Sequence, residues 1–299
     1  MTRLEDLGAW PARVLWVALA LMAESCVSDA IDGRSTAVRV VVLAGLWLGW
    51  AAGLVALLVP RSSALTGLRI IVPAGAAAMV ACTAAGSTTS ALDLVAVGVG
   101  ALAAAAVLMP WVGEAWVDGS SYGPEHRLLL RPPVLFSVIL VPVTWAAVVA
   151  GATVGPLLLA ARQWVPGVLL TALGAGVVYA GVRSLHQLTR RWIVLVPTGM
   201  VIHDPITMPE AQLFLRTSIA RLGPALASDG DPTSDDAPDD LTGGAPGLAL
   251  VLQLSENVEL LLRTKGRETA TKDSTAVLFT PTRPGHLLEI AAERRIPVG

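Results

Sequence analysis

Long uncharged runs occupy the first part of the chain, and short alternating runs follow them. The clearest long run is 40–59, which contains no charged residue and ends at Pro60 and Arg61. About 20 apolar residues in a helix cross the ~30 Å hydrocarbon core of a bilayer. We therefore predict an α-helical, multi-pass membrane domain over residues 1–187.

Further runs of this kind predict the number of spans. They lie at 70–86, 94–112, 134–152 and 164–182. The uncharged stretch that begins near residue 134 continues to Arg162, which is longer than one span requires. We expect its helix to end near residue 152 and a re-entrant or interfacial remainder to contain Pro156.

An earlier apolar segment, 10–27, allows three interpretations. Arg13 and Glu24 bracket only ten uncharged residues, so the segment could be a short span, an interfacial helix or a signal peptide. Glu5 and Asp6 precede it, and an acidic leader is not typical of a signal peptide. We therefore prefer six spans and keep five spans as the alternative.

The arginines predict the orientation of the spans. Cytoplasmic loops of membrane proteins carry an excess of Lys and Arg, and Trp is enriched at the membrane interface. Arg183, Arg190, Arg191 and Trp192 follow the last span, and we interpret them as a juxtamembrane anchor on the cytoplasmic side. Alternation of the loops then places both termini in the cytoplasm, with the chain in the plasma membrane. The external segment 24–39 then holds Arg34 and Arg39, which Glu24, Asp29 and Asp32 outnumber, and Arg162 is the one base that departs from the pattern.

Small residues form a stripe along the span 40–59. Gly45, Gly49 and Gly53 repeat every four residues, which lets another backbone approach closely. The stripe could pack against a neighbouring span of the same chain or form the contact face of a homo-oligomer, and both interpretations stay open.

Chemically reactive residues are rare in the apolar runs. Pro73 and Pro142 interrupt two spans, as in some transporters, but the uncharged cores hold no ionisable residue for a substrate. Cys26 and Cys82 are the two cysteines, and we interpret both as buried thiols rather than a disulfide or a metal site. Residues 125–127, Glu-His-Arg, are assigned to a solvated cytoplasmic loop.

The region 188–299 has runs of strand length and is predicted to be a mostly-β cytoplasmic domain. Residues 192–196 and 200–204 flank Pro-Thr-Gly and predict a hairpin, with weaker strands at 213–216 and 218–222. Residues 228–247 are rich in Asp, Gly and Pro, and predict a disordered acidic loop that folding does not require.

The last part of this domain alternates with a period of two. Leucines at 248, 250, 252 and 254 predict a strand, Glu256 and Asn257 a turn, and Val258, Leu260 and Leu262 a returning strand. A strand at 275–280 and a helix at 284–295 follow. The inner face of that helix is expected to hold Leu287, Leu288, Ala291 and Ala292.

Antiparallel strands closed by one C-terminal helix are the layout of a pleckstrin-homology-like (PH-like) barrel. The segments RRWIVLVPTGMVIHD (190–204), FLRTSIARL (214–222) and FTPTRP (279–284) resemble uncharacterised multi-pass membrane proteins of actinobacteria. They also resemble, more loosely, bacterial PH-like domains. The resemblance implies a PH-like cytoplasmic domain and carries over no functional residue.

Composition narrows the function by exclusion. The 299 residues are 54% hydrophobic and 15% charged, and the net charge of -2 argues against a nucleic-acid partner. The motifs HExxH, GxSxG, P-loop and CxxC are absent from the sequence, so we expect no enzyme activity and no cofactor or metal. The leading hypothesis is a membrane-anchored scaffold, regulatory or accessory subunit with lipid and protein partners. The alternatives are a transporter or channel subunit, and then a membrane enzyme acting on lipid or cell-wall precursors.

Overall fold

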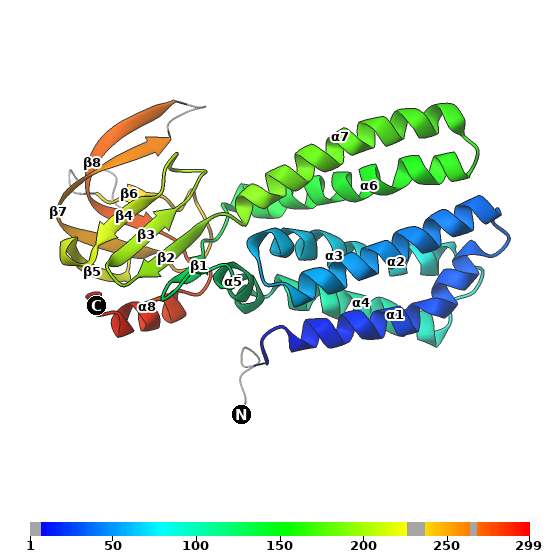
Figure 1. Cartoon of the computed structure of the whole chain (residues 1–299), viewed down its shortest axis with the longest axis horizontal. Helices are drawn as coiled ribbons and strands as arrows, with labels where there is room; N and C mark the ends of the chain where they lie inside the picture. Colours follow the sequence, from blue (N-terminus) through cyan, green and yellow to red (C-terminus); the bar gives the residue numbers. More distant parts are fainter. Residues whose placement is uncertain (1–6, 226–236, 264–267) are drawn as a thin grey trace. The chain divides into compact units, whose positions relative to one another are not determined.

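The computed structural model describes residues 7–225, 237–263 and 268–299 (Figure 1). The chain divides into two compact units. One, the helical unit, consists of Met1–Trp116 and Val141–His186; the other, the β unit, consists of Val117–Leu140 and Gln187–Gly299. The β unit thus begins its second part at Gln187, and it also contains Val117–Leu140, a segment predicted to belong to the membrane domain.

In the described ranges, six helices are long and apolar enough to cross a membrane, as the preferred count predicted. They are α1 (Trp10–Ile31), α2 (Thr36–Leu58), α3 (Ser62–Ala85), α4 (Ala91–Leu108), α6 (Val141–Ala160) with the preceding π-helical turn η2 (Phe136–Leu140), and α7 (Trp164–Leu188). A short helix, α5 (Pro110–Asp118), follows α4. The ambiguous segment 10–27 lies in a helix of 22 residues, which favours six spans over five.

The expected re-entrant remainder after residue 152 is wrong, because α6 continues through Pro156 to Ala160. Membrane helices tolerate an interior proline where neighbouring groups satisfy the freed backbone atoms. The helix ends instead at a Schellman-type turn. The Arg162 N–H donates to Leu159 O and the Gln163 N–H to Leu158 O, with Arg162 in the left-handed conformation at φ 63°.

The glycine stripe of α2 is divided between two environments. A Cβ added to Gly53 would lie 2.7 Å from the Trp16 ring, so this glycine makes room for the buried Trp16 of α1. The Trp16 indole N–H donates to Trp50 O at 3.0 Å. At Gly45 and Gly49, no described heavy atom lies within 4 Å of an added Cβ. Packing within the chain thus accounts for Gly53 alone.

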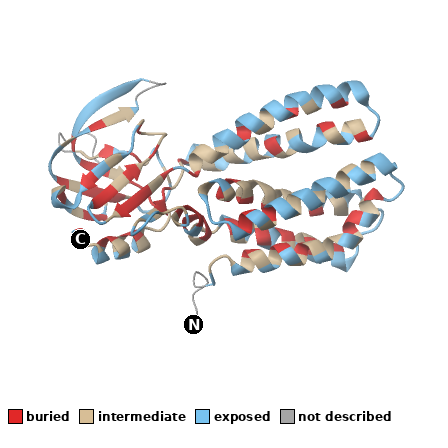
Figure 2. Cartoon of the chain, in the orientation of Figure 1, coloured by how far each residue is buried: buried red, intermediate tan, exposed pale blue. Residues whose placement is uncertain are grey.

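Helices α6 and α7 form a hairpin that packs through backbone contacts at glycines. A Cβ on Gly151 of α6 would lie 3.1 Å from Gly174 O, and one on Gly174 of α7 would collide with Gly151 O. Gly181 of α7 instead makes room for the side chains of Val148 and Thr144. The outward faces of both helices are exposed (Figure 2).

Replacing Gly174 with leucine is expected to separate α6 from α7 and to lower the thermal stability of the detergent-solubilised protein. Overpacking of this kind costs about 1–3 kcal/mol or more. Gly176→Leu is the matched control on the same helix, because no described atom lies within 4 Å of its added Cβ. Equal melting temperatures for the two variants would show that the hairpin does not pack as described.

The described part of the β unit contains two four-stranded sheets and a final helix. The first sheet has the order β1 (His126–Leu129), β2 (Trp192–Val196), β3 (Gly199–His203), β4 (Gln212–Leu215). The second has the order β5 (Ile219–Pro224), β7 (Leu250–Arg263), β8 (Thr269–Phe279), β6 (Asp239–Asp240). The two sheets do not close into a barrel, so a PH-like fold is not confirmed.

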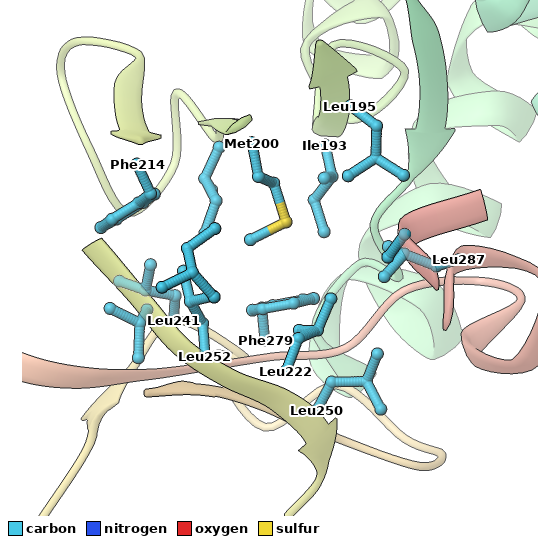
Figure 3. Packing of buried hydrophobic residues seen from close by; sticks show 14 of the residues in the cluster. Ile193, Leu195, Met200, Phe214, Leu222, Leu241, Leu250, Leu252, Phe279 and Leu287 are labelled. Atoms are coloured by element: carbon cyan, nitrogen blue, oxygen red, sulfur yellow. The ribbon is translucent and has the colours of Figure 1, made fainter. Parts of the chain in front are cut away.

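The two sheets share one hydrophobic core (Figure 3). Ile193 and Met200 of the first sheet face Leu252 and Phe279 of the second, and all four are fully buried. Helix α8 (Pro284–Glu293) adds Leu287 and Ala291 to the buried set; Ala292, predicted on the same face, is exposed. Burying one such leucine or isoleucine is worth about 1.5–3 kcal/mol.

Strand β1 comes from the segment that was assigned to a solvated loop. It pairs antiparallel with β2, with Leu129 opposite Trp192. Leu128 and the adjacent Leu130 join the shared core, and Leu130 also bridges to Pro281 after β8. Along the chain, β1 precedes α6 and β2 follows α7. The α6–α7 hairpin thus connects, in the sequence, two strands that pair with each other in the sheet.

Two further predictions for the β unit are wrong. Glu256 and Asn257 do not reverse the chain: β7 is one strand from Leu250 to Arg263, with a register irregularity between Gln253 and Val258. A polar pair at this irregularity resembles a turn in the sequence. The strand predicted at 275–280 begins earlier, at Thr269, and pairs with β7 on both sides of that irregularity.

The acidic segment 228–247 is ordered at its C-terminal end, contrary to expectation. Asp239 and Asp240 form β6, which runs parallel to β8. Leu241 is 3% exposed in the shared core, and the Lys272 ammonium group lies 2.5 Å from the Asp239 carboxylate. A deletion that reaches residue 244 would therefore remove a core leucine. The prediction for residues 228–236 lies outside the described residues.

Candidate functional site

The junction between α7 and β2 holds three of the four residues predicted as a juxtamembrane anchor. Arg190 is exposed, as an anchor requires. Arg183 is exposed on α7, in the helical unit. Arg191 has a different environment, because its side chain is only 1% exposed. A side chain buried in this way does not fit the juxtamembrane anchor predicted for Arg191.

Arg191 instead forms a buried ion pair with Asp204, the residue after β3. Its Nε and Nη2 atoms donate to the two carboxylate oxygens at 2.7 and 2.6 Å. Its Nη1 atom donates to Arg131 O at 2.8 Å, just beyond β1. The Asp204 carboxylate also accepts from the Ile206 N–H. This bidentate pair ties the ends of β1, β2 and β3 together.

Trp192 lies on the outer face of the first sheet between side chains of the two neighbouring strands. The His203 ring on β3 stacks on it at 5.1 Å between centroids, with 28° between the planes. The Arg127 guanidinium on β1 lies 5.6 Å from the ring centroid, in a cation–π arrangement. We call Arg127, Trp192 and His203 the Trp192 stack.

Acidic residues fix the β1 side of the Trp192 stack. Arg127 Nη2 lies 3.3 Å from the Glu125 carboxylate. The Asp118 carboxylate accepts from the Arg127 backbone N–H at 2.8 Å and lies 3.5 Å from His126 Nδ1. The Glu-His-Arg triplet thus starts a strand and has a structural explanation.

The surroundings of His203 favour its neutral form. Burial lowers the pKa of His203 from its ordinary value, the positive charge of Arg190 lowers it further, and Asp204 acts in the opposite direction. In the described part of the chain, His203 Nε2 and Arg127 Nε are buried without a hydrogen-bond partner.

The depressed pKa of His203 predicts that the β unit loses stability in mild acid. The neutral ring is favoured in the folded state, so its contribution is complete above the unfolded-state pKa of about 6.5. It declines as the pH falls from there toward the lower folded-state pKa. Denaturation of the full-length protein across this range should show the decline. The variant His203→Phe keeps an aromatic ring against Trp192 but has no group that titrates, so its stability should depend less on pH. A pH profile of stability equal to that of the wild type would contradict the role given to His203.

The edge strand β4 carries the exposed apolar residues of the first sheet. Leu213 pairs with Val201 and Leu215 with Gly199, which places both leucines on the outer face. They are 44% and 48% exposed. In the described ranges no strand pairs with the other edge of β4. An unpaired edge with apolar side chains is a template for pairing with another chain.

One ionisable residue lies deeper in a span than the sequence indicated. Because α3 begins at Ser62, Arg69 lies about two turns inside it. Its Nε atom is buried and has no hydrogen-bond partner among the described residues. Nearby on α3, Thr66 Oγ1 lies 2.9 Å from His186 Nδ1 of α7.

In the described ranges, no group of three or more His, Cys, Asp or Glu side chains is arranged so that it could hold a metal ion. Comparisons of the chain with protein-family models, curated proteins and solved structures find no match.

Proposed function

We propose that the protein is a membrane-anchored scaffold, a regulatory or accessory subunit of an inner-membrane complex that acts through protein–protein contact. In this proposal both termini face the cytoplasm, and the β unit presents the interaction surface at the inner face of the plasma membrane. Arg183 and Arg190 contribute to anchoring, since a basic residue near an anionic surface is worth about 1 kcal/mol.

The observation that carries this proposal is the free edge of β4 with Leu213 and Leu215 exposed beside it. Strand addition to a sheet edge gives affinity through main-chain hydrogen bonds and specificity through alternate side chains. The β4 edge offers both features. Leucine side chains at such a surface lose water when a partner strand covers them.

The chain topology also supports a scaffold. The β unit receives β1 before α6 and β2 after α7, so membrane helices are attached to it at two neighbouring strands. The Arg191–Asp204 pair and Arg131 O hold these strands together. The two chain segments that connect the β unit to the α6–α7 hairpin therefore leave from neighbouring positions in the first sheet.

The test is quantitative co-purification of the tagged, full-length protein from native membranes in mild detergent. We expect stoichiometric partners with the wild type and their loss when Leu213 and Leu215 are both changed to lysine. Leu248→Lys is the matched control, because Leu248 is 51% exposed on the same unit and lies outside β4. Partner loss in the control as well, or retention in the double variant, would remove β4 as the interface.

A transporter or channel subunit is the second candidate, and Arg69 is the observation that favours it. An arginine with a buried Nε atom two turns inside α3, one turn before Pro73, is unusual unless it binds an anion or lines a pathway. Purification as a solitary monomer with bound lipid, together with loss of function in Arg69→Gln, would move the assignment to this candidate.

A further inference from the structure

Polar contacts join the C-terminal end of α1 to the connection between α3 and α4 and to the start of α4. The Asp29 carboxylate on α1 accepts from Ser87 Oγ at 2.9 Å and from the Thr88 N–H at 3.3 Å, in the connection between α3 and α4. Ser25 Oγ donates to the Asp93 carboxylate of α4 at 2.9 Å. These contacts fix the last turns of α1 against α3 and α4.

The two cysteines lie within this joined end. Cys26 Sγ on α1 lies 3.3 Å from Thr83 Oγ1 and 3.6 Å from Met79 O on α3. Residues three and four apart share one face of a helix, so Cys82 belongs to the face of α3 that receives Cys26.

The backbones of α1 and α3 also come close one turn further along. A Cβ on Gly86 would lie 3.2 Å from the carboxyl carbon of Asp29, so only a glycine fits there without a shift. Cys26 contacts Met79 and Thr83, and Asp29, one turn later in α1, contacts Gly86, just after α3. The two helices therefore run parallel here. Such a pair of facing helices can bring two thiols to disulfide distance with small side-chain rotations.

We propose that Cys26 and Cys82 are a redox-active dithiol that closes to an intramolecular disulfide between α1 and α3. The oxidant is another disulfide, from a small molecule or a protein. Cys82 is partly exposed and Cys26 is buried, so Cys82 is the thiol that reacts first.

The exchange balances in two steps. The Cys82 thiolate attacks the external disulfide, which forms a mixed disulfide and releases one thiol. The Cys26 thiolate then attacks the Cys82 sulfur, which forms the internal S–S bond and releases the second thiol. The two protons of Cys26 and Cys82 pass to the two released thiols, so the external disulfide is reduced and the protein dithiol is oxidised. In the proposed orientation this end of the helices faces the outside of the cell, where disulfides persist.

The test treats the reduced, full-length protein in detergent with 4,4′-dithiodipyridine, an apolar disulfide that releases thiopyridone at each step. We expect two thiopyridones released per chain, no retained thiopyridyl group, and an intact mass lower by two hydrogen atoms. Cys26→Ser should release one thiopyridone and retain one thiopyridyl adduct on Cys82. Oxidation should also raise the melting temperature of the wild type but not of Cys26→Ser.

The contrary results are equally distinct in the same measurements. Two retained thiopyridyl adducts on the wild-type chain would show that the thiols cannot meet. Covalent dimers without an internal disulfide would show that Cys82 faces another molecule. Either result overturns the proposal, and the wild-type measurement does not depend on the folding of a variant.

Discussion

Arg191→Met is expected to destabilise the β unit by about 3–5 kcal/mol, because it leaves the Asp204 carboxylate buried and without its counter-ion. That carboxylate is fully buried and receives two short bonds from Arg191. The loss is comparable with the total stability of many domains, so the unit should unfold or become sensitive to protease. Limited proteolysis and hydrogen exchange of β2 and β3 in the full-length protein would measure it.

Arg190→Met is the matched control, since it removes the same charge one residue earlier from an exposed position. Its effect should stay within about 0.5 kcal/mol. Combining Arg191→Met with Asp204→Leu should recover part of the stability, because removing both buried charges costs less than leaving one. Similar protection in the Arg190 and Arg191 variants would mean that Arg191 is solvated.

A fragment containing only residues 188–299 is expected not to fold. It lacks β1, and therefore Leu128 and Leu130, which are 2% and 3% exposed in the shared core. Each is worth about 1.5–3 kcal/mol, and β2 would also lose its partner strand. A fusion of residues 117–132 through a flexible linker to residues 187–299 restores β1 and should give a cooperative unfolding transition by circular dichroism.

The same dependence on β1 can be tested without fragments. Leu128→Asp in the full-length protein should unfold the β unit, because it places a carboxylate in the core beside Ile193. Tyr122→Asp, in the same segment but 87% exposed, should have little effect. A folded 188–299 fragment, or a stable Leu128→Asp variant, would show that β1 is dispensable.

Features governed by nearby residues were predictable. Each helix that crosses the hydrocarbon core must by itself be long enough and nearly uncharged. The run at 40–59 therefore predicts α2 whatever helices lie beside it. The hairpin of β2 and β3 was predictable for a similar reason. Its strands are joined by the two residues Pro197 and Thr198, so turn and pairing lie in one short segment.

Features that depend on distant partners were not predictable. Four residues, His126–Leu129, are too short to be recognised as a strand until β2 supplies the hydrogen bonds. Arg190 and Arg191 are the same residue type in consecutive positions, and only Arg191 is buried, where Asp204 and Arg131 O receive its hydrogen bonds. Gly53 and Gly45 likewise occupy equivalent places in one repeat, and Trp16 of another helix distinguishes them. In each case the stabilising contact forms between two segments that are distant in the sequence. The residues of one segment alone do not indicate which other segment it will contact.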